Sequence, residues 1–148
     1  MIHHSLTEDG GTVSWPAIEK YHKETNHWLD IGYHAGIEVV TDNPDLTTYK
    51  YQAIVGRPVY AIAAACPQGL MNEKALHVCC VGNFDLVSPT KEMLSVLLKR
   101  VLIPWATEFS IPPTNWVGHR EYNPHKSCPG NMFDLNALRV YGALGRIT

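Results

Sequence analysis

Apolar positions recur with different periods along the chain, and the first segment with a clear pattern is helical. Ser14 is a candidate helix N-cap, and Pro16 fits the first helical turn because a proline there loses no backbone hydrogen bond. In this segment bulky side chains recur every three or four residues, which predicts a helix that ends near Asn26 and His27. The repeating positions are Trp15, Ile18 and His22.

Three apolar runs with high β-propensity predict strands, since Gly, Pro, Asp or Asn bounds each of them. They cover residues 33–40, 59–64 and 76–81. Their hydrophobicity is nearly continuous rather than alternating. This favours a central sheet that is covered on both faces.

A second helical pattern follows these runs. It begins at Ser88 and Pro89, and its apolar stripe spans residues 93–102. Because a proline removes one helical hydrogen bond and crowds the preceding turn, we expect the helix to stop or kink around Pro104.

The C-terminal part completes the predicted architecture. Residues 116–118 look like a short strand that delivers His119 to a strand end, and Asp134 is a candidate cap for a last helix through Arg139. Strands that alternate with helices predict an α/β (α+β) fold, in which a mixed central β-sheet carries helices on both faces. No repeat or flexible linker interrupts the chain, so we expect one domain over residues 1–148.

Composition and charge exclude several classes of protein. The chain has 148 residues, of which 45% are hydrophobic and 18% charged, as is typical of a globular protein with one core. Its formal net charge of −2 offers no general attraction to nucleic acid or anionic lipid. No apolar run approaches the roughly 20 residues that span a bilayer. We therefore expect a monomer without a nucleic-acid or membrane partner.

Four cysteines are too few for a disulfide framework at this length. Cys79 and Cys80 are adjacent and would point to opposite faces of a strand, so we interpret them as small buried hydrophobic residues. No basic segment followed by an apolar stretch opens the chain. We therefore predict a cytoplasmic protein without a signal peptide.

The residues that carry the most chemical information lie near the two ends of the chain. His119 and Cys128 are separated by a loop rich in turn-forming residues, which could fold the thiolate back onto the imidazole. His3 and His4 lie on opposite faces of a predicted strand, so only one of them can face a given site. Two imidazoles and a thiolate, with a fourth position open for water, are what a three-ligand catalytic zinc site requires. The spacing alone does not establish a metal pair, because no tight motif enforces it.

Four separated segments carry a more specific signal. They read IHHSLT at residues 2–7, WLDIGYH at 28–34, LHVCCVGNF at 76–84, and GHRE through CPG at 118–130. In order and spacing they resemble the motifs of the zinc N-acetylmuramoyl-L-alanine amidases, the family that includes the T7-type phage lysozyme and the peptidoglycan recognition proteins. The resemblance covers essentially the whole chain.

The resemblance implies one zinc ion per chain, held by His3, His119 and Cys128, with Tyr33 and Lys126 at its open face. It implies hydrolysis of the amide between the lactyl group of N-acetylmuramic acid and the L-alanine of the stem peptide, in peptidoglycan or a muropeptide. One thiolate leaves such a zinc site with net positive charge, enough to acidify a bound water and polarise a carbonyl. Lys126 would stabilise the oxyanion of the tetrahedral intermediate. Tyr33 would hydrogen-bond the attacking water or that oxyanion, and help move a proton.

The other histidines receive a plainer interpretation. We expect His4, His22, His27 and His77 either to be packed in the protein or to contact a metal ligand without binding the metal. The family that the sequence resembles likewise places the metal on the first histidine of the His3–His4 pair. His77 stands where that family commonly has a glycine.

Two further features are left open by the sequence. Glu121 could orient an imidazole or form a salt bridge with Arg120 or Arg139. Residues 63–69 read AAACPQG where many relatives place a histidine on the cleft rim. Cys66 could therefore be a rim residue or a buried one.

Three hypotheses remain at this level: a peptidoglycan amidase, a non-catalytic peptidoglycan-binding or regulatory module, and a protein without a metal. Family members that only recognise peptidoglycan have lost the thiolate, so Cys128 favours the enzyme. We expect no separate cell-wall-binding module beside the predicted catalytic domain. Together with the lack of a signal peptide, this fits a phage or prophage endolysin, released to the cell wall by lysis, better than a secreted host amidase.

Overall fold

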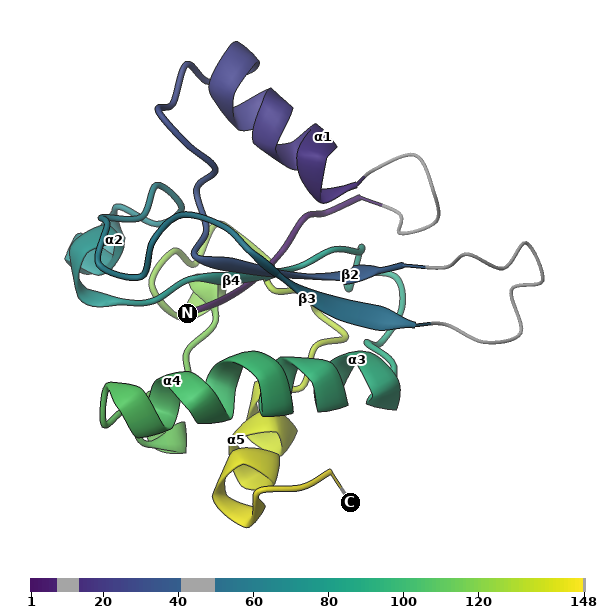
Figure 1. Cartoon of the computed structure of the whole chain (residues 1–148). Helices are drawn as coiled ribbons and strands as arrows, with labels where there is room; N and C mark the ends of the chain where they lie inside the picture. The colour runs from purple at the N-terminus through teal and green to yellow at the C-terminus, as the bar shows by residue number, and fades with distance from the viewer. Residues whose placement is uncertain (8–13, 41–49, 148) are drawn as a thin grey trace.

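The computed structural model describes residues 1–7, 14–40 and 50–147, which contain a mixed four-stranded sheet (Figure 1). The strand order is β1 (Ile2–His4), β4 (Val78–Cys80), β2 (Ala35–Val39) and β3 (Tyr51–Val55). β4 runs parallel to both of its neighbours, whereas β3 pairs antiparallel with β2. β2 and β4 lie within the strands predicted over residues 33–40 and 76–81, and the mixed central sheet is confirmed.

Helices cover both faces of this sheet, as predicted. On one face lies α1 (Trp15–Lys20), which continues as a π-helical turn over Tyr21–Thr25 (Figure 1). Trp15 of this helix shares a core cluster with Cys79, whereas Cys80 belongs to the larger core on the opposite face. Both cysteines are free and fully buried, which confirms their interpretation as small hydrophobic residues.

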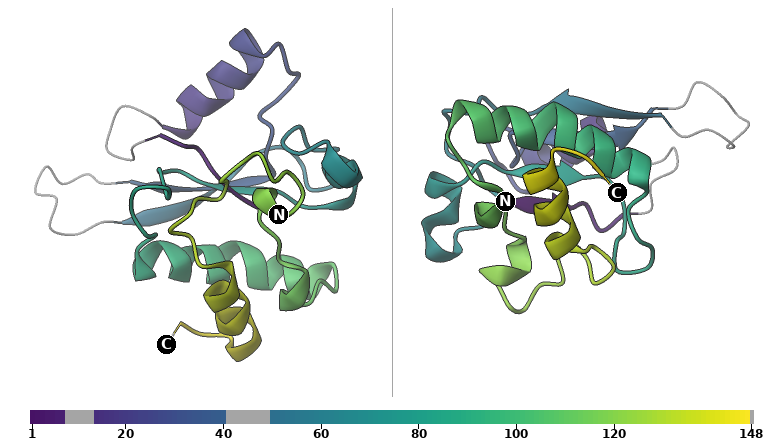
Figure 2. Two further views of the ribbon diagram at one scale, coloured as in Figure 1. Left: turned by 180° about the vertical axis from the view of Figure 1, so that it is seen from behind. Right: turned by 90° about the horizontal axis from the view of Figure 1, so that it is seen from below.

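Three helices cover the opposite face (Figure 2). They are α3 (Lys91–Leu97), α4 (Ile103–Glu108) and α5 (Leu135–Leu144). Asp134 caps α5 as predicted, since its carboxylate accepts a hydrogen bond from the backbone N of Ala137 at 2.9 Å. The helix continues beyond its predicted end at Arg139. The remaining helical segments are α2 (Met71–Lys74) and 3-10 turns over Gln68–Leu70, Pro113–Asn115 and His119–Glu121. Among the described helices, none is both long and apolar enough to cross a bilayer.

The second predicted helix begins later than expected. Its N-cap is Thr90 rather than Ser88, and the Thr90 hydroxyl accepts a hydrogen bond from Met93 N at 3.1 Å. Near Pro104 the helix widens into a π-helical turn over Leu98–Leu102 and then resumes as α4. The wider turn accommodates a residue that has no amide proton and crowds the turn before it. Of the two outcomes predicted around Pro104, a stop or a kink, the stop is wrong, since the helix continues through Pro104 to Glu108.

The strand predicted over residues 59–64 is wrong, and β3 takes its place in the sheet. A turn begins this segment, with Ala61 N donating to the carbonyl of Pro58 at 2.9 Å. Tyr60 and Ile62 are 89% and 61% exposed, so the apolar run lies on the surface. β3 escaped prediction because it is an edge strand with mostly exposed side chains, which leaves a weak hydrophobic pattern.

Residues 116–118 do not form the predicted strand, but they still bring His119 to the end of a strand. A single bridge joins Gly118 to Ile2 of β1, and Ile2 N donates to the carbonyl of Val117 at 2.8 Å. His119 follows directly. The bridge thereby places His119 next to the first strand.

Candidate metal centre

Three side chains from opposite ends of the chain meet beside β1. His3 lies on β1, His119 begins the 3-10 turn after Gly118, and Cys128 lies in the loop beyond. One ligand atom from each lies within 4.8 Å of the other two. The Nδ1 of His3 and the Sγ of Cys128 are 3.6 Å apart. In the described part of the chain, this is the only group of three or more His, Cys, Asp or Glu residues with such geometry.

The donor atoms suit a metal ion such as zinc, which binds imidazole nitrogen and thiolate sulfur. The Nε2 of His119 is buried without a hydrogen-bond partner, alone in this among the side-chain nitrogens and oxygens of the described residues. Buried polar atoms are almost always paired, because an unpaired one costs free energy. The orphaned nitrogen therefore indicates a place where a ligand completes its bonding.

Burial favours the neutral imidazoles that metals bind. It lowers the pKa of His119, and it lowers the pKa of His3 well below the usual value. Burial also raises the pKa of Cys128 to about 12, an effect that the backbone N–H of His4 and the charge of Lys126 oppose. A cation in the group would favour the thiolate, because coordination displaces the thiol proton.

Tyr33 and Lys126 flank this group. The ring centroid of Tyr33 lies 5.2 Å from that of His3. Burial raises the pKa of Tyr33 well above its usual value, so the hydroxyl keeps its proton at neutral pH. Lys126 is exposed in the loop before Cys128, and its positive charge lowers the pKa of both His119 and Cys128. Both side chains lie near the candidate ligands.

The other residues singled out in the sequence lie outside the ligand group. The ring of His4 accepts a hydrogen bond from Phe84 N at 3.3 Å, which agrees with its exclusion from the metal site. His22 is buried, as expected, and Cys66 proves to be fully buried rather than a rim residue. The expectation that His27 is packed is wrong. The chain leaves the first helix there at a φ of 57°, and the side chain is exposed.

Comparison with known proteins identifies the family of the chain. Residues 1–131 match the family model described as N-acetylmuramoyl-L-alanine amidase. The chain belongs to this amidase family. The resemblance read from its four sequence motifs is thereby confirmed. Among curated protein sequences, none matches the chain.

Solved structures of several proteins share the amidase fold. The endolysin amidase LysCS of Clostridium intestinale URNW is 21% identical with a TM-score of 0.72, and the match covers 98% of this chain and 81% of that one. Wild-type PGRP-LB of Drosophila is 23% identical with a TM-score of 0.67, covering 88% and 73%. PGRP-SA of Apis mellifera is 21% identical with a TM-score of 0.69, covering 89% and 75%. At these identities the likeness shows a shared fold.

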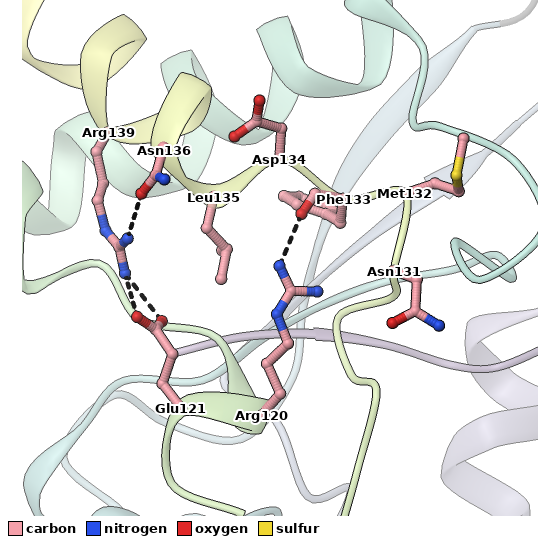
Figure 3. Close-up of a pocket in the computed structure, with 9 residues that line it drawn as sticks. All are labelled: Arg120, Glu121, Asn131, Met132, Phe133, Asp134, Leu135, Asn136 and Arg139. Carbon is pink, nitrogen blue, oxygen red and sulfur yellow. Dashed lines mark hydrogen bonds and ion pairs between the residues drawn. The ribbon is translucent and has the colours of Figure 1, made fainter. Parts of the chain in front are cut away.

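In this amidase-family chain, Arg120 holds the loop that carries Cys128. The backbone N of Arg120 donates to the carbonyl of Cys128 at 2.7 Å. Its guanidinium donates to the carbonyl of Phe133 at 3.1 Å (Figure 3) and also to that of Gly130. Arg120 thus holds the loop at the candidate ligand and at two positions after it.

Glu121 forms the salt bridge that was one of its two predicted roles. Its carboxylate lies 2.8 Å from the guanidinium of Arg139 (Figure 3) and accepts a hydrogen bond from Gly118 N at 2.6 Å. The residues in Figure 3 border a hollow of about 430 Å³, but none of the three candidate ligands lines it. The hollow is therefore separate from the candidate metal group.

Asp85 and Gly130 fix the far end of the loop. The Asp85 carboxylate accepts hydrogen bonds from Ser127 Oγ at 2.6 Å and Asn131 N at 2.8 Å, and these bonds hold its pKa below the usual value. Gly130 has a φ of 119° and lies so close to the backbone of Phe84 that a Cβ would collide with it. The hydrogen bonds join residues 42 and 46 positions apart, and nothing in the sequence marks them.

Gly130→Ala should destabilise the protein and weaken metal binding, because the added methyl group meets the Phe84 backbone at a positive φ. Gly145→Ala is the matched control. Gly145 also has a positive φ but open space around it, so its replacement should cost only about 1 to 2 kcal/mol. Denaturant unfolding and metal titration of both variants measure the difference. Equal losses would contradict the close approach assigned to Gly130.

Proposed function

We propose that this chain is a zinc-dependent N-acetylmuramoyl-L-alanine amidase. It hydrolyses the amide between the lactyl group of N-acetylmuramic acid and the L-alanine of the stem peptide. The observation that carries the proposal is the group of His3, His119 and Cys128, with its orphaned imidazole nitrogen, in a chain of this family. The thiol of Cys128 supports catalysis, since the resemblance implies that members which only recognise peptidoglycan have lost it.

Three protein ligands leave one position of a tetrahedral site open. A zinc ion in this group would supply Lewis acidity to a water and to the amide carbonyl. His3 and His119 offer neutral imidazoles, and Cys128 offers the only negative charge of the three. The group would therefore keep a net positive charge, which favours the negative charge that develops on the carbonyl oxygen.

Tyr33 and Lys126 are the residues we assign to the transition state. Because Tyr33 keeps its hydroxyl proton, it can donate a hydrogen bond to the attacking water or to the oxyanion, and it can help move a proton. Lys126 lies in the same loop as Cys128, so its cation can stabilise the oxyanion from the solvent side. Neither residue belongs to the ligand group.

Peptidoglycan or a muropeptide is the substrate that we propose. A tyrosine-to-phenylalanine mutant of Drosophila PGRP-LB, 23% identical with a TM-score of 0.67 over 99% of this chain and 80% of that one, is solved in complex with tracheal cytotoxin. LysCS of Clostridium intestinale is described as an endolysin. The likeness to LysCS supports an endolysin role. In this role, we propose, a monomeric cytoplasmic protein reaches the cell wall on lysis.

A second candidate function is recognition of peptidoglycan without catalysis, because peptidoglycan recognition proteins share this fold. The two functions differ in one measurable respect. Only an amidase releases the amino group of L-alanine from peptidoglycan. Zinc-loaded protein that binds a muropeptide without this release would favour recognition.

Cys128→Ser should lose most of its metal, because a neutral hydroxyl replaces an anionic thiolate. The wild type should carry one zinc per chain. Cys66→Ser is the matched control, since Cys66 is fully buried but outside the ligand group, and it should keep its zinc. Atomic absorption after gel filtration measures the metal content. Stoichiometric zinc in Cys128→Ser would refute the ligand assignment.

Removal of zinc should lower the melting temperature of the wild type, because a metal that binds only the folded chain stabilises it by mass action. At free zinc 100 times the Kd, the expected stabilisation is about 2.7 kcal/mol. Calorimetry with and without a chelator measures this shift, and Cys128→Ser serves as the variant that should not respond. An unchanged wild-type curve would argue that the metal does not join β1 to the C-terminal loop.

Lys126→Ala and Tyr33→Phe should keep zinc and fold but lose turnover. Loss of one oxyanion donor typically lowers kcat on the order of 100- to 1,000-fold. Muropeptide binding should change much less, because these contacts form in the transition state. The readouts are release of L-alanine amino groups and muropeptide affinity. His125→Ala, at an exposed position in the same loop, is the control for Lys126. Near wild-type turnover in both variants would overturn the mechanism.

A further inference from the structure

A buried histidine to which the proposed reaction assigns no task, His77, lies directly behind His3. It precedes β4 and is fully buried. Its Nδ1 lies 2.8 Å from the Nε2 of His3. The ring centroids are 5.1 Å apart and the ring planes differ by only 22°, so the two nitrogens face each other almost within the planes of both rings. This is the geometry of an N–H···N hydrogen bond.

The proton positions in this pair follow from a third partner. The Nε2 of His77 lies 2.9 Å from the carbonyl oxygen of Met71, which can only accept. A neutral imidazole carries one ring proton, so His77 holds it on Nε2, and its Nδ1 is an acceptor. His3 must then donate from its own Nε2. The Nδ1 of His3 is left with a free lone pair, and this is the atom that lies 3.6 Å from the Sγ of Cys128.

His77 is itself held in place by the layer behind it. Its backbone N donates to the Nδ1 of His34 at 2.9 Å. The Nε2 of His34 lies 2.9 Å from the carbonyl of Ala61, to which it donates. Two backbone carbonyls, those of Ala61 and Met71, therefore determine the ring orientations of the chain of histidines that ends at His3.

We propose that His77 is a positioning residue for the metal site: it selects the His3 tautomer that presents Nδ1 and holds the ring in the orientation for binding. Groups that hydrogen-bond the second nitrogen of a metal-bound histidine have this effect in other metal sites, and their loss typically weakens metal binding roughly 10- to 100-fold. The inference rests on the metal site proposed above.

The first test compares His77→Asn with His77→Leu. The Asn Oδ1 can accept from His3 near the position of the His77 Nδ1, whereas Leu fills a similar volume without an acceptor. Both variants lose the bond to Met71, so that structural loss is common to them. We expect His77→Leu to bind zinc roughly 10- to 100-fold more weakly than the wild type in chelator competition. His77→Asn should recover most of this loss, and the two zinc-free proteins should melt at similar temperatures.

The second test reads the tautomer directly. Nitrogen-15 NMR of the zinc-free wild type should show the His3 proton on Nε2, and in His77→Leu it should be shared between both ring nitrogens. A purely structural role for His77 would not move this signal. Equal zinc affinity in wild type and His77→Leu, or equal losses in the Leu and Asn variants, would overturn the proposal. A wild-type proton on the Nδ1 of His3 would do so even if neither variant folded.

These results separate the failure of this inference from that of the proposed function. Cys128→Ser in the same competition assay reports whether the three-ligand site exists. If it loses zinc while His77→Leu binds normally, only the role of His77 is wrong. If both retain zinc, the metal site itself is wrong and the proposal for His77 falls with it.

Discussion

The constraint on which this structure depends is that three potential ligand atoms from opposite ends of the chain meet within 4.8 Å of one another. The parallel pairing of β1 with β4 places His3, and the bridge from Ile2 to Gly118 brings His119 beside it. Cys128 has no strand to position it and depends on its loop. The buried Nε2 of His119, which lacks a partner, shows that the fold closes around this point without satisfying it by itself.

Hydrogen bonds to backbone groups fix the positions of the candidate ligands, which the sheet alone does not determine. Arg120 joins three parts of the Cys128 loop through carbonyl oxygens, and Asp85 holds its far end through Ser127. His77 acts in the same way on His3, with its own orientation set by Met71. Arg120 and Asp85 bind loop atoms rather than the candidate ligands, and their charges shift the pKa of Cys128 in opposite directions, while His77 is neutral. A metal held by this group would thereby keep the positive charge that the proposed reaction requires.

The sequence predicted the parts of this account that depend on residue type and motif order. The family and the meeting of His3, His119 and Cys128 could be anticipated from the order and spacing of four motifs, and the mixed sheet from the apolar runs. The strand predicted over residues 59–64 was wrong, because an apolar run has the same pattern whether it is buried or, as here, largely exposed. Asp85 was missed because its hydrogen-bond partners lie 42 and 46 positions away along the chain. His77 stood out only as a departure from glycine, and its bond to His3 required the folded geometry.

The central claim is that this metal group cleaves one particular amide, and mass spectrometry of a purified muropeptide tests it most directly. After incubation with zinc-loaded wild-type protein, the account predicts two products, a lactyl-bearing sugar acid and a free peptide that begins with L-alanine. Together their masses should exceed that of the substrate by one water, and Cys128→Ser should leave the substrate intact. Cleavage at a different bond, or an intact muropeptide that the wild-type protein demonstrably binds, would contradict the account.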